Sequence, residues 1–234
     1  MEDFTRFYQK SETVGSYDRI RLKGFKQGIN REIELIVLSK MVPKGAILEV
    51  GPGTGYITQI LVKKGKVIAV EPSQEMIKEA KSRAPGAKYI NKGLFQYKSK
   101  SKFDSIVTIR VLGHFSPLEL DHALNHISNL IKPSGRIIFS IENSSFVRRF
   151  IRAFKKKRVE TYQFSKSQIL ALLNRNGLKA ERIVPTDHFW ILSPLYILNK
   201  LFLGRLRRVI INAEINLLSV PYCNVNWIII CRKK

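Results

Sequence analysis

Unbroken apolar segments alternate with amphipathic segments along most of the chain. Predicted strands, which are short apolar runs, cover residues 46–50, 66–71, 87–91, 103–109, 136–142, 178–184 and 224–234. Predicted helices, with apolar residues three and four positions apart, cover residues 30–41, 56–63, 73–84, 117–132 and 166–176. Strands that alternate with helices indicate βαβ units. The pattern therefore predicts an α/β fold, in which helices cover both faces of a doubly wound, mostly parallel sheet of seven strands.

Capping residues support several of these boundaries. Asn30 and Ser73 are predicted N-caps, because their side chains can accept a hydrogen bond from the first turn of a helix. Pro117 stands at a predicted helix start, where its missing N–H has no consequence. Gly177 is expected to end a helix, and residues 133–135, Pro-Ser-Gly, are expected to form a turn.

A glycine-rich loop follows the first predicted strand. Three glycines alternate in the segment 49–55, EVGPGTG. A loop between a parallel strand and a helix lies at the carboxyl edge of the sheet, where open α/β sheets bind ligands. The dinucleotide fingerprint G-x-G-x-x-G/A fails, because Tyr56 occupies its third small position. A phosphate-binding loop also fails, because no Lys-Ser or Lys-Thr pair follows and Pro52 has no N–H for a pyrophosphate.

The pattern E-x-G-x-G-x-G over residues 49–55 strongly resembles motif I of the class I S-adenosylmethionine-dependent methyltransferases. A second carboxylate, Glu71, ends the next predicted strand. Residues 103–115 are similar to the fourth strand of this family with the loop after it, and residues 130–143 to its Leu-Lys-Pro-Gly-Gly turn and fifth strand. The resemblance covers residues 45–143. It implies a Rossmann-like sheet with an antiparallel C-terminal strand, and S-adenosyl-L-methionine as the cofactor.

The resemblance also implies a set of cofactor-binding residues. Glu49 and the glycine loop would lie under the methionine part, and Glu71 would hold the ribose, because a carboxylate can accept hydrogen bonds from both hydroxyls of a cis-diol. Pro72 and Met76 would lie beside the adenine, and Arg110 beside the sulfonium. The implied set is Glu49, Gly51, Pro52, Gly53, Thr54, Gly55, Glu71, Pro72, Met76, Leu94, Phe95 and Arg110, with Tyr17 and Arg21 closing over the methionine end from the N-terminal segment.

The loop after the fourth predicted strand bears on the acceptor. Methyl transfer from a sulfonium is an in-line displacement, to which the protein contributes alignment and a dry site. Residues 108–115, TIRVLGHF, lack the Asn/Asp-Pro-Pro-Tyr/Phe motif of methylases that act on the amino groups of bases. They resemble the small-molecule branch, which includes quinone-biosynthesis enzymes. His114 is the candidate base or acceptor contact. His122 and His126 lack the Glu of H-E-x-x-H, so we predict no metal site.

We expect a single methyltransferase domain over residues 1–234, since no Gly/Ser-rich linker divides the chain. Residues 1–44 would form an N-terminal helical cover and residues 45–143 the cofactor-binding core. Residues 144–234 would form the substrate-side half, with an insertion at residues 187–222 before the last strand.

The net charge of the chain predicts an anionic partner. The chain carries 41 Lys and Arg against 18 Asp and Glu, a net charge of +23, which attracts nucleic acid, anionic lipid or a phosphorylated substrate. The insertion is apolar and ends in Arg205, Arg207 and Arg208. It fits three roles: a packed helical cover, a lid over an apolar substrate, or a contact with an anionic membrane.

A second basic segment leaves other functions open. Residues 146–158 hold seven Lys or Arg with interleaved phenylalanines, and they could contact tRNA or rRNA. The favoured function is methyl transfer to a small, apolar or lipid-like acceptor such as a quinone or polyprenyl compound. The alternatives are an RNA methyltransferase and a non-catalytic cofactor-binding partner subunit.

The N-terminus and the cysteines indicate the compartment. The segment 1–10 has no apolar stretch, so we do not expect a signal peptide. Cys223 and Cys231 match no zinc or redox spacing. These features predict a cytoplasmic protein that could bind peripherally at the inner face of the membrane.

Overall fold

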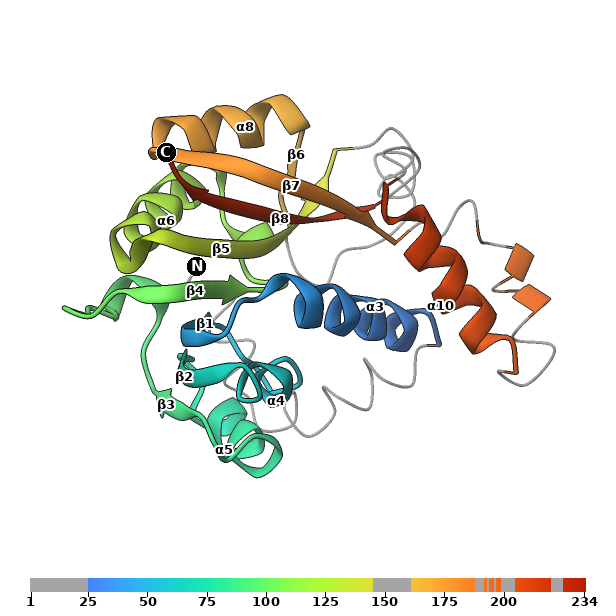
Figure 1. Ribbon diagram of the computed structural model, residues 1–234, viewed down its shortest axis with the longest axis horizontal. Coiled ribbons are helices and arrows are strands. Elements are labelled where there is room, and N and C mark those ends of the chain that lie inside the picture. Colours follow the sequence, from blue (N-terminus) through green and yellow to red (C-terminus); the bar gives the residue numbers. More distant parts are fainter. Residues whose placement is uncertain are drawn as a thin grey trace.

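The computed structural model describes residues 25–144, 161–187, 192, 194–195, 197–198, 205–219 and 225–234. Its strands are β1 (Gly45–Val50), β2 (Gly65–Val70), β3 (Lys88–Ile90), β4 (Phe103–Thr108), β5 (Ile131–Asn143), β6 (Gln163–Phe164), β7 (Leu178–Thr186) and β8 (Asn226–Lys233). Its helices are α3 (Phe25–Met41), α4 (Thr58–Leu61), α5 (Gln74–Arg83), α6 (Pro117–Leu130), α8 (Lys166–Arg175) and α10 (Arg207–Asn216), with short 3-10 turns η1 (Leu94–Gln96), η2 (Leu112–His114) and η3 (Leu217–Ser219). Figure 1 shows their arrangement.

The strands form one sheet in the order β3-β2-β1-β4-β5-β8-β7, and the two-residue strand β6 pairs with β5. Strand β8 is antiparallel to both β5 and β7, whereas the other pairings are parallel. The predicted fold class is therefore confirmed. The order changes direction between β1 and β4, so the loops after these two strands diverge and leave room for a ligand between them.

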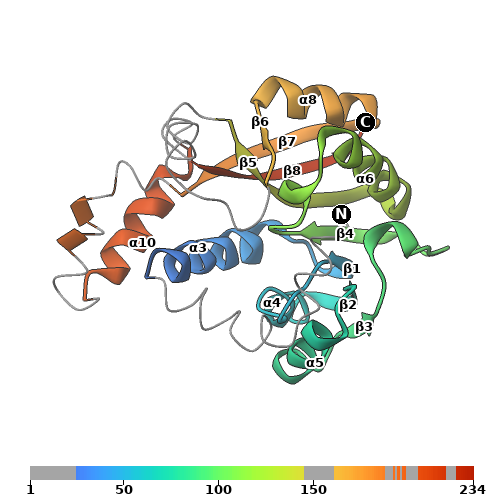
Figure 2. The ribbon, with the colours of Figure 1, turned by 180° about the vertical axis from the view of Figure 1, so that it is seen from behind.

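Neighbouring residues of each central strand pack into different cores, which explains the unbroken apolar runs. Leu48 and Ile106 belong to the core that α6 and α8 cover, whereas Ile47 and Val107 belong to the core that α3 and α10 cover. Figures 1 and 2 both show α10 beside α3. The helical cover of one face is thus built from segments at opposite ends of the chain.

The structure confirms some predicted boundaries and corrects others. The side chain of Ser73 caps α5 by accepting a hydrogen bond from Met76 N, and Pro117 begins α6. Asn30 was expected as an N-cap, and this prediction is wrong: α3 begins at Phe25 and contains Asn30. Apolar residues such as Ile29 are fully buried, so packing extends the helix past a residue whose local preference is to begin one.

The Pro-Ser-Gly segment 133–135 does not form a separate turn but lies within the bounds of β5. The pairing of β4 with β5 shifts there, because Phe103 pairs with Ile131 whereas Ser105 pairs with Arg136. The extra residues of β5 are accommodated as an irregularity of the strand. No described helix is long and apolar enough to cross a membrane.

Candidate functional site

The glycine loop follows β1 near the centre of the sheet. Its three glycines are required there for different structural reasons. All three have positive φ angles, 69° at Gly51, 55° at Gly53 and 79° at Gly55, a conformation that glycine adopts without steric cost. A Cβ at Gly51 would lie 2.5 Å from the side chain of Val111, and one at Gly55 would lie 2.9 Å from Ala80 Cα. A Cβ at Gly53 would meet no atom within 4 Å. Gly51 and Gly55 therefore allow close packing, whereas Gly53 leaves open space above the loop.

Glu71 connects this loop to the end of β2. Its Oε2 accepts a hydrogen bond from Gly53 N at 3.2 Å, and its Oε1 accepts one from Ser73 N at 3.0 Å. Burial raises the pKa of the Glu71 carboxyl, and these two N–H donors counteract that rise. The carboxylate is thus held in one orientation by backbone on both sides, and it remains at the wall of a cavity.

Glu49 lies beneath the loop in a more apolar environment. Its side chain is 3% exposed, and burial, with the nearby charge of Glu71, raises its pKa to about 8. Its Oε2 makes no hydrogen bond to any residue that the structure describes. A buried carboxyl of this kind is protonated at neutral pH, and it would be stabilised in the charged form by a cationic ligand.

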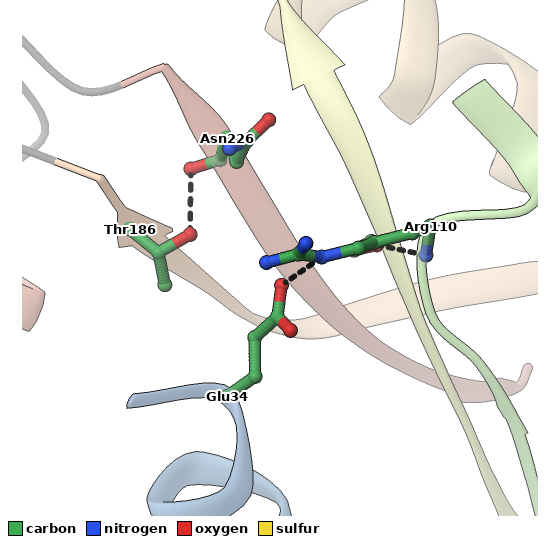
Figure 3. Close-up of polar contacts among 5 residues, drawn as sticks. Glu34, Arg110, Thr186 and Asn226 are labelled. Atoms are coloured by element: carbon green, nitrogen blue, oxygen red, sulfur yellow. Dashed lines mark hydrogen bonds and ion pairs between the residues drawn. The ribbon is translucent and has the colours of Figure 1, made fainter. Parts of the chain in front are cut away.

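Helix α3 contributes two charged residues that sequence reasoning did not identify. Arg31 is buried, with its guanidinium 4.7 Å from the ring centroid of Tyr56, directly after the loop. Glu34, one turn further, accepts a hydrogen bond from Arg110 Nε at 2.9 Å (Figure 3). These residues lie three apart on one helix face. That spacing alone did not single them out, because α3 precedes the glycine loop and carries no motif.

The residues above surround a cavity of about 510 Å³ at the carboxyl edge of β1, β2 and β4, a volume typical of sites for small molecules and cofactors. Eleven of the predicted residues line it: Glu49, Gly51, Pro52, Gly53, Thr54, Glu71, Pro72, Met76, Leu94, Phe95 and Arg110. Gly55 does not line it and instead packs against α5. Tyr17 and Arg21 lie outside the described residues.

Other lining residues had no clear signal in the sequence. Asn91, just after β3, donates hydrogen bonds through Nδ2 to the carbonyl oxygens of Glu71 and Pro72, at 3.0 and 2.9 Å, so its side chain is fixed at the cavity wall. Phe95 and Phe115 stack with ring centroids 5.9 Å apart. Asn91 thus supplies the polar side chain just after β3.

The histidines that the sequence singled out do not line the cavity. His114 is in η2 and does not line the cavity. On α6, the Nε2 atom of His126 is 2.9 Å from the carbonyl oxygen of Tyr97, and the imidazole packs edge-on against Phe95. Among the described residues there is no group of three side chains that could hold a metal ion.

Comparison with known proteins finds similarity to methyltransferases. Residues 47–135 match the family model for the methyltransferase domain. An uncharacterized methyltransferase from Alkaliphilus oremlandii is 30% identical over 119 residues, which are 49% of this chain and 55% of that relative. One from Geobacillus kaustophilus is 28% identical over 173 residues, 67% of this chain and 80% of the relative. This chain thus spans about half the length of the first of these relatives.

Solved structures share the fold over nearly the whole chain. The DhpI–SAH complex covers 98% of this chain and 94% of its own, with a TM-score of 0.68 and 15% identity. A methyltransferase from Clostridium acetobutylicum covers 94% and 98%, with a TM-score of 0.64 and 15% identity. The family match and the shared fold both agree with the resemblance inferred from the sequence. Residues 47–135 are thus similar to the methyltransferase domain, and the chain has the fold of solved S-adenosylmethionine-dependent methyltransferases.

Proposed function

We propose that the protein binds S-adenosyl-L-methionine and transfers its methyl group to a small, apolar or lipid-like acceptor. The observation that carries this proposal is the position of Glu71. It lines the same cavity as the glycine loop, and backbone N–H groups of Gly53 and Ser73 hold both of its oxygens. Each carboxylate oxygen has a further lone pair, so the group can still accept hydrogen bonds from two ribose hydroxyls.

The rest of the cavity fits the other parts of the cofactor. Met76 and Pro72 at the start of α5 offer apolar surface for adenine. The open space above Gly53 allows the ligand to approach the backbone. Glu49 provides a buried oxygen for the cationic methionine end, and Arg31 provides a guanidinium for its carboxylate. These residues bind and orient the cofactor, which supplies the activated methyl carbon.

The acceptor side is inferred from the insertion before β8. Its described residues Leu192 and Ile211 join the core beside α3, whereas Ile197 is 64% exposed and Val209 is 50% exposed. Such a surface would bind an apolar acceptor, for example a quinone or polyprenyl compound, more favourably than a polar surface would, because binding buries apolar area.

The test follows the methyl group. Purified protein is incubated with methyl-labelled S-adenosylmethionine and extract of the source cells, and the label is then measured in the lipid, water-soluble and RNA fractions. We expect the label in a small molecule that partitions into organic solvent. Label in tRNA or rRNA would replace this proposal by the RNA alternative, for which the basic segment 146–158 lies outside the described residues. Absence of transfer despite cofactor binding would favour a non-catalytic subunit.

We further propose that the insertion contacts an anionic membrane. Arg205 and Arg208 are exposed beside Val209, so cationic and apolar groups share one surface. Arg207 differs from its neighbours, because its Nε and Nη2 donate hydrogen bonds to Glu32 Oε2 on α3, at 3.1 and 2.8 Å. It holds α10 in place and should be left intact in experiments on the membrane contact.

The double variant Arg205→Glu/Arg208→Glu is expected to lose most of its pelleting with vesicles that contain phosphatidylglycerol, since each basic residue near an anionic surface contributes about 1 kcal/mol. The matched control is Lys88→Glu/Lys100→Glu, which makes the same change in net charge at exposed positions at the start of β3 and before β4. Equal loss in both double variants would mean that net charge alone, and not this surface, drives the association.

A further inference from the structure

Positive charge is concentrated at the edge of the sheet opposite the cavity. The cavity lies at the carboxyl ends of β1, β2 and β4. The opposite edge consists of the amino ends of β1, β2, β4, β5 and β7 and the last residues of β8, which is antiparallel to its neighbours. Strand β3 is not part of it, because β3 begins opposite Ile68, further along β2. At these strand ends there are ten cations, Lys44, Lys64, Lys66, Lys102, Lys132, Arg136, Lys179, Arg232, Lys233 and Lys234, which we call the basic edge, and two acids, Asp104 and Glu181.

The strand pairings place these cations in one row. Lys66 of β2 pairs with Ala46 of β1. Arg232 of β8 pairs with Arg136 of β5 on one side and with Lys179 of β7 on the other. The strand order from β2 to β7 contains five spacings, and each is about 4.8 Å, so the row is about 24 Å long. Like charges therefore lie side by side along a nearly continuous edge.

The two acids balance only part of this charge. Asp104 pairs with Lys132 at 2.8 Å, and Glu181 binds Arg136 and Arg232 at 2.8 and 3.4 Å. The exposed lysines at the starts of β2 and β7 take no part in these pairs. Ten cations against two acids leave a positive potential, which attracts an anionic partner to this edge.

The chemistry of the basic edge favours a nucleic acid over a membrane. Contact with a membrane uses apolar side chains that enter the lipid. The exposed large apolar residues of the described chain lie on α6, α8, α10 and in the insertion, and not at these strand ends. A nucleic acid is bound through its phosphates by Lys and Arg alone. An edge of about 24 Å matches about seven phosphates of one strand of a duplex, which follow one another every 3.4 Å along the axis.

We propose that the basic edge binds a nucleic acid through its phosphate backbone, without reading the base sequence. The six residues of β1 separate this edge from the glycine loop, which is a distance of about 20 Å at about 3.3 Å per residue. The nucleic acid is therefore bound away from the cavity, as a partner of the protein. This inference goes beyond the proposed function and does not depend on cofactor binding.

The test measures fluorescence anisotropy of labelled duplexes with the full chain. A duplex of about 15 base pairs, prepared as RNA and as DNA, is titrated at several salt concentrations from about 50 to about 200 mM. We expect wild-type protein to bind a duplex with an affinity that falls steeply as salt rises, because each phosphate contact releases counterions. The tighter of the two duplexes identifies the kind of nucleic acid.

The variant Lys66→Glu/Lys179→Glu reverses two exposed charges, one on β2 and one on β7. It is expected to lose at least about tenfold in affinity for the duplex. The slope of log affinity against log salt should also become shallower by about 2, since each phosphate contact contributes about 0.9 to it. Lys66→Gln/Lys179→Gln, which removes the charges without reversing them, should lose less and provides a second variant if the first does not fold.

The matched control is Arg205→Glu/Arg208→Glu, which makes the same change in net charge in the insertion. Figures 1 and 2 both show α10 at the opposite end of the strands from the C-terminus, which belongs to the basic edge. Charges separated by more than the screening length of about 10 Å interact little at about 0.1 M salt. We therefore expect this control to change duplex affinity by less than about threefold.

Three results would overturn the proposal. Wild-type protein that binds neither duplex at about 50 mM salt has no such surface. Equal losses in Lys66→Glu/Lys179→Glu and in the control would mean that net charge alone drives the binding. If Lys66→Glu/Lys179→Glu keeps the duplex and loses its pelleting with anionic vesicles, the basic edge is a membrane surface.

Discussion

Replacing Glu71 by alanine is expected to reduce the affinity for S-adenosylmethionine by about a hundredfold or more. The variant loses two hydrogen bonds that the charged carboxylate accepts from the ribose hydroxyls of the proposed complex. Each contributes about 1.5–3 kcal/mol, and about 1.4 kcal/mol corresponds to a factor of ten. It also removes the acceptor for Gly53 N and Ser73 N, so the loop is less well ordered before binding. Isothermal titration calorimetry with cofactor and with S-adenosylhomocysteine measures the effect.

The matched control for this variant is Glu75→Ala. Glu75 lies four residues further in the first turn of α5, pairs with Lys78 at 2.9 Å and does not line the cavity. We expect its cofactor affinity to stay within about twofold of wild type, since exposed ion pairs contribute about 1 kcal/mol or less and this one is outside the cavity. Unchanged affinity in Glu71→Ala itself would show that the ligand does not use the end of β2, and the assignment of the cavity would fail.

Cofactor affinity is expected to increase with pH as Glu49 ionises. Its pKa is raised to about 8 by burial and by the charge of Glu71, so at pH 6 the carboxyl is neutral and has little attraction for the cationic methionine end. Between pH 6 and pH 9 we expect about a tenfold or greater gain in affinity for wild type and less than about twofold for Glu49→Gln, because one pKa unit corresponds to about 1.36 kcal/mol. Calorimetry in buffers of different ionisation enthalpy should also detect proton release on binding.

Glu49 is also expected to make the stability of the protein depend on pH. Stability should fall as pH rises, whereas cofactor affinity should increase. Between pH 4.5 and about 8 the folded protein keeps a proton on Glu49 that the unfolded chain has lost. Stability of the cofactor-free protein therefore falls as pH rises through this window. Glu49→Gln lacks this term and should melt several degrees above wild type at pH 9, since each kcal/mol changes Tm by about 2–4 °C at this chain length. A variant that melts below wild type at pH 9, with equal Tm at pH 4, would mean that Glu49 is ionised in the folded protein.

The order of elements was predictable because its signals are local. Apolar runs such as residues 46–50 and 103–109 indicated buried strands, and the structure places neighbouring residues of these strands in different cores. Ser73 and Pro117 marked helix starts correctly. Asn30 did not, because the apolar face of α3 continues before it and burial outweighs a capping preference. The two-residue strand β6 is too short to produce a periodic pattern.

Some residues of the candidate site could be predicted from the sequence, and others could not. The glycine loop and Glu71 could be found because they sit at fixed distances from strands along the chain, and eleven of the predicted residues line the cavity. Gly55 was grouped with them by spacing alone, but its position next to Ala80 can be known only from packing. His114 was singled out by residue type, and the structure places it outside the cavity lining.

The sequence by itself indicated the resemblance to methyltransferases, the site of the glycine loop and the carboxylate after β2, since each depends on residues close together in the chain. Only the tertiary structure decided what faces that loop. The pair Glu34–Arg110 joins residues 76 positions apart, and Glu32–Arg207 joins residues 175 apart. Neither pair leaves a trace in local periodicity, because α3 is brought over the sheet by its apolar face and its charged residues meet their partners as a consequence. The glycine loop and Glu71 could therefore be found from the sequence, whereas the residues of α3 that face them required the tertiary structure.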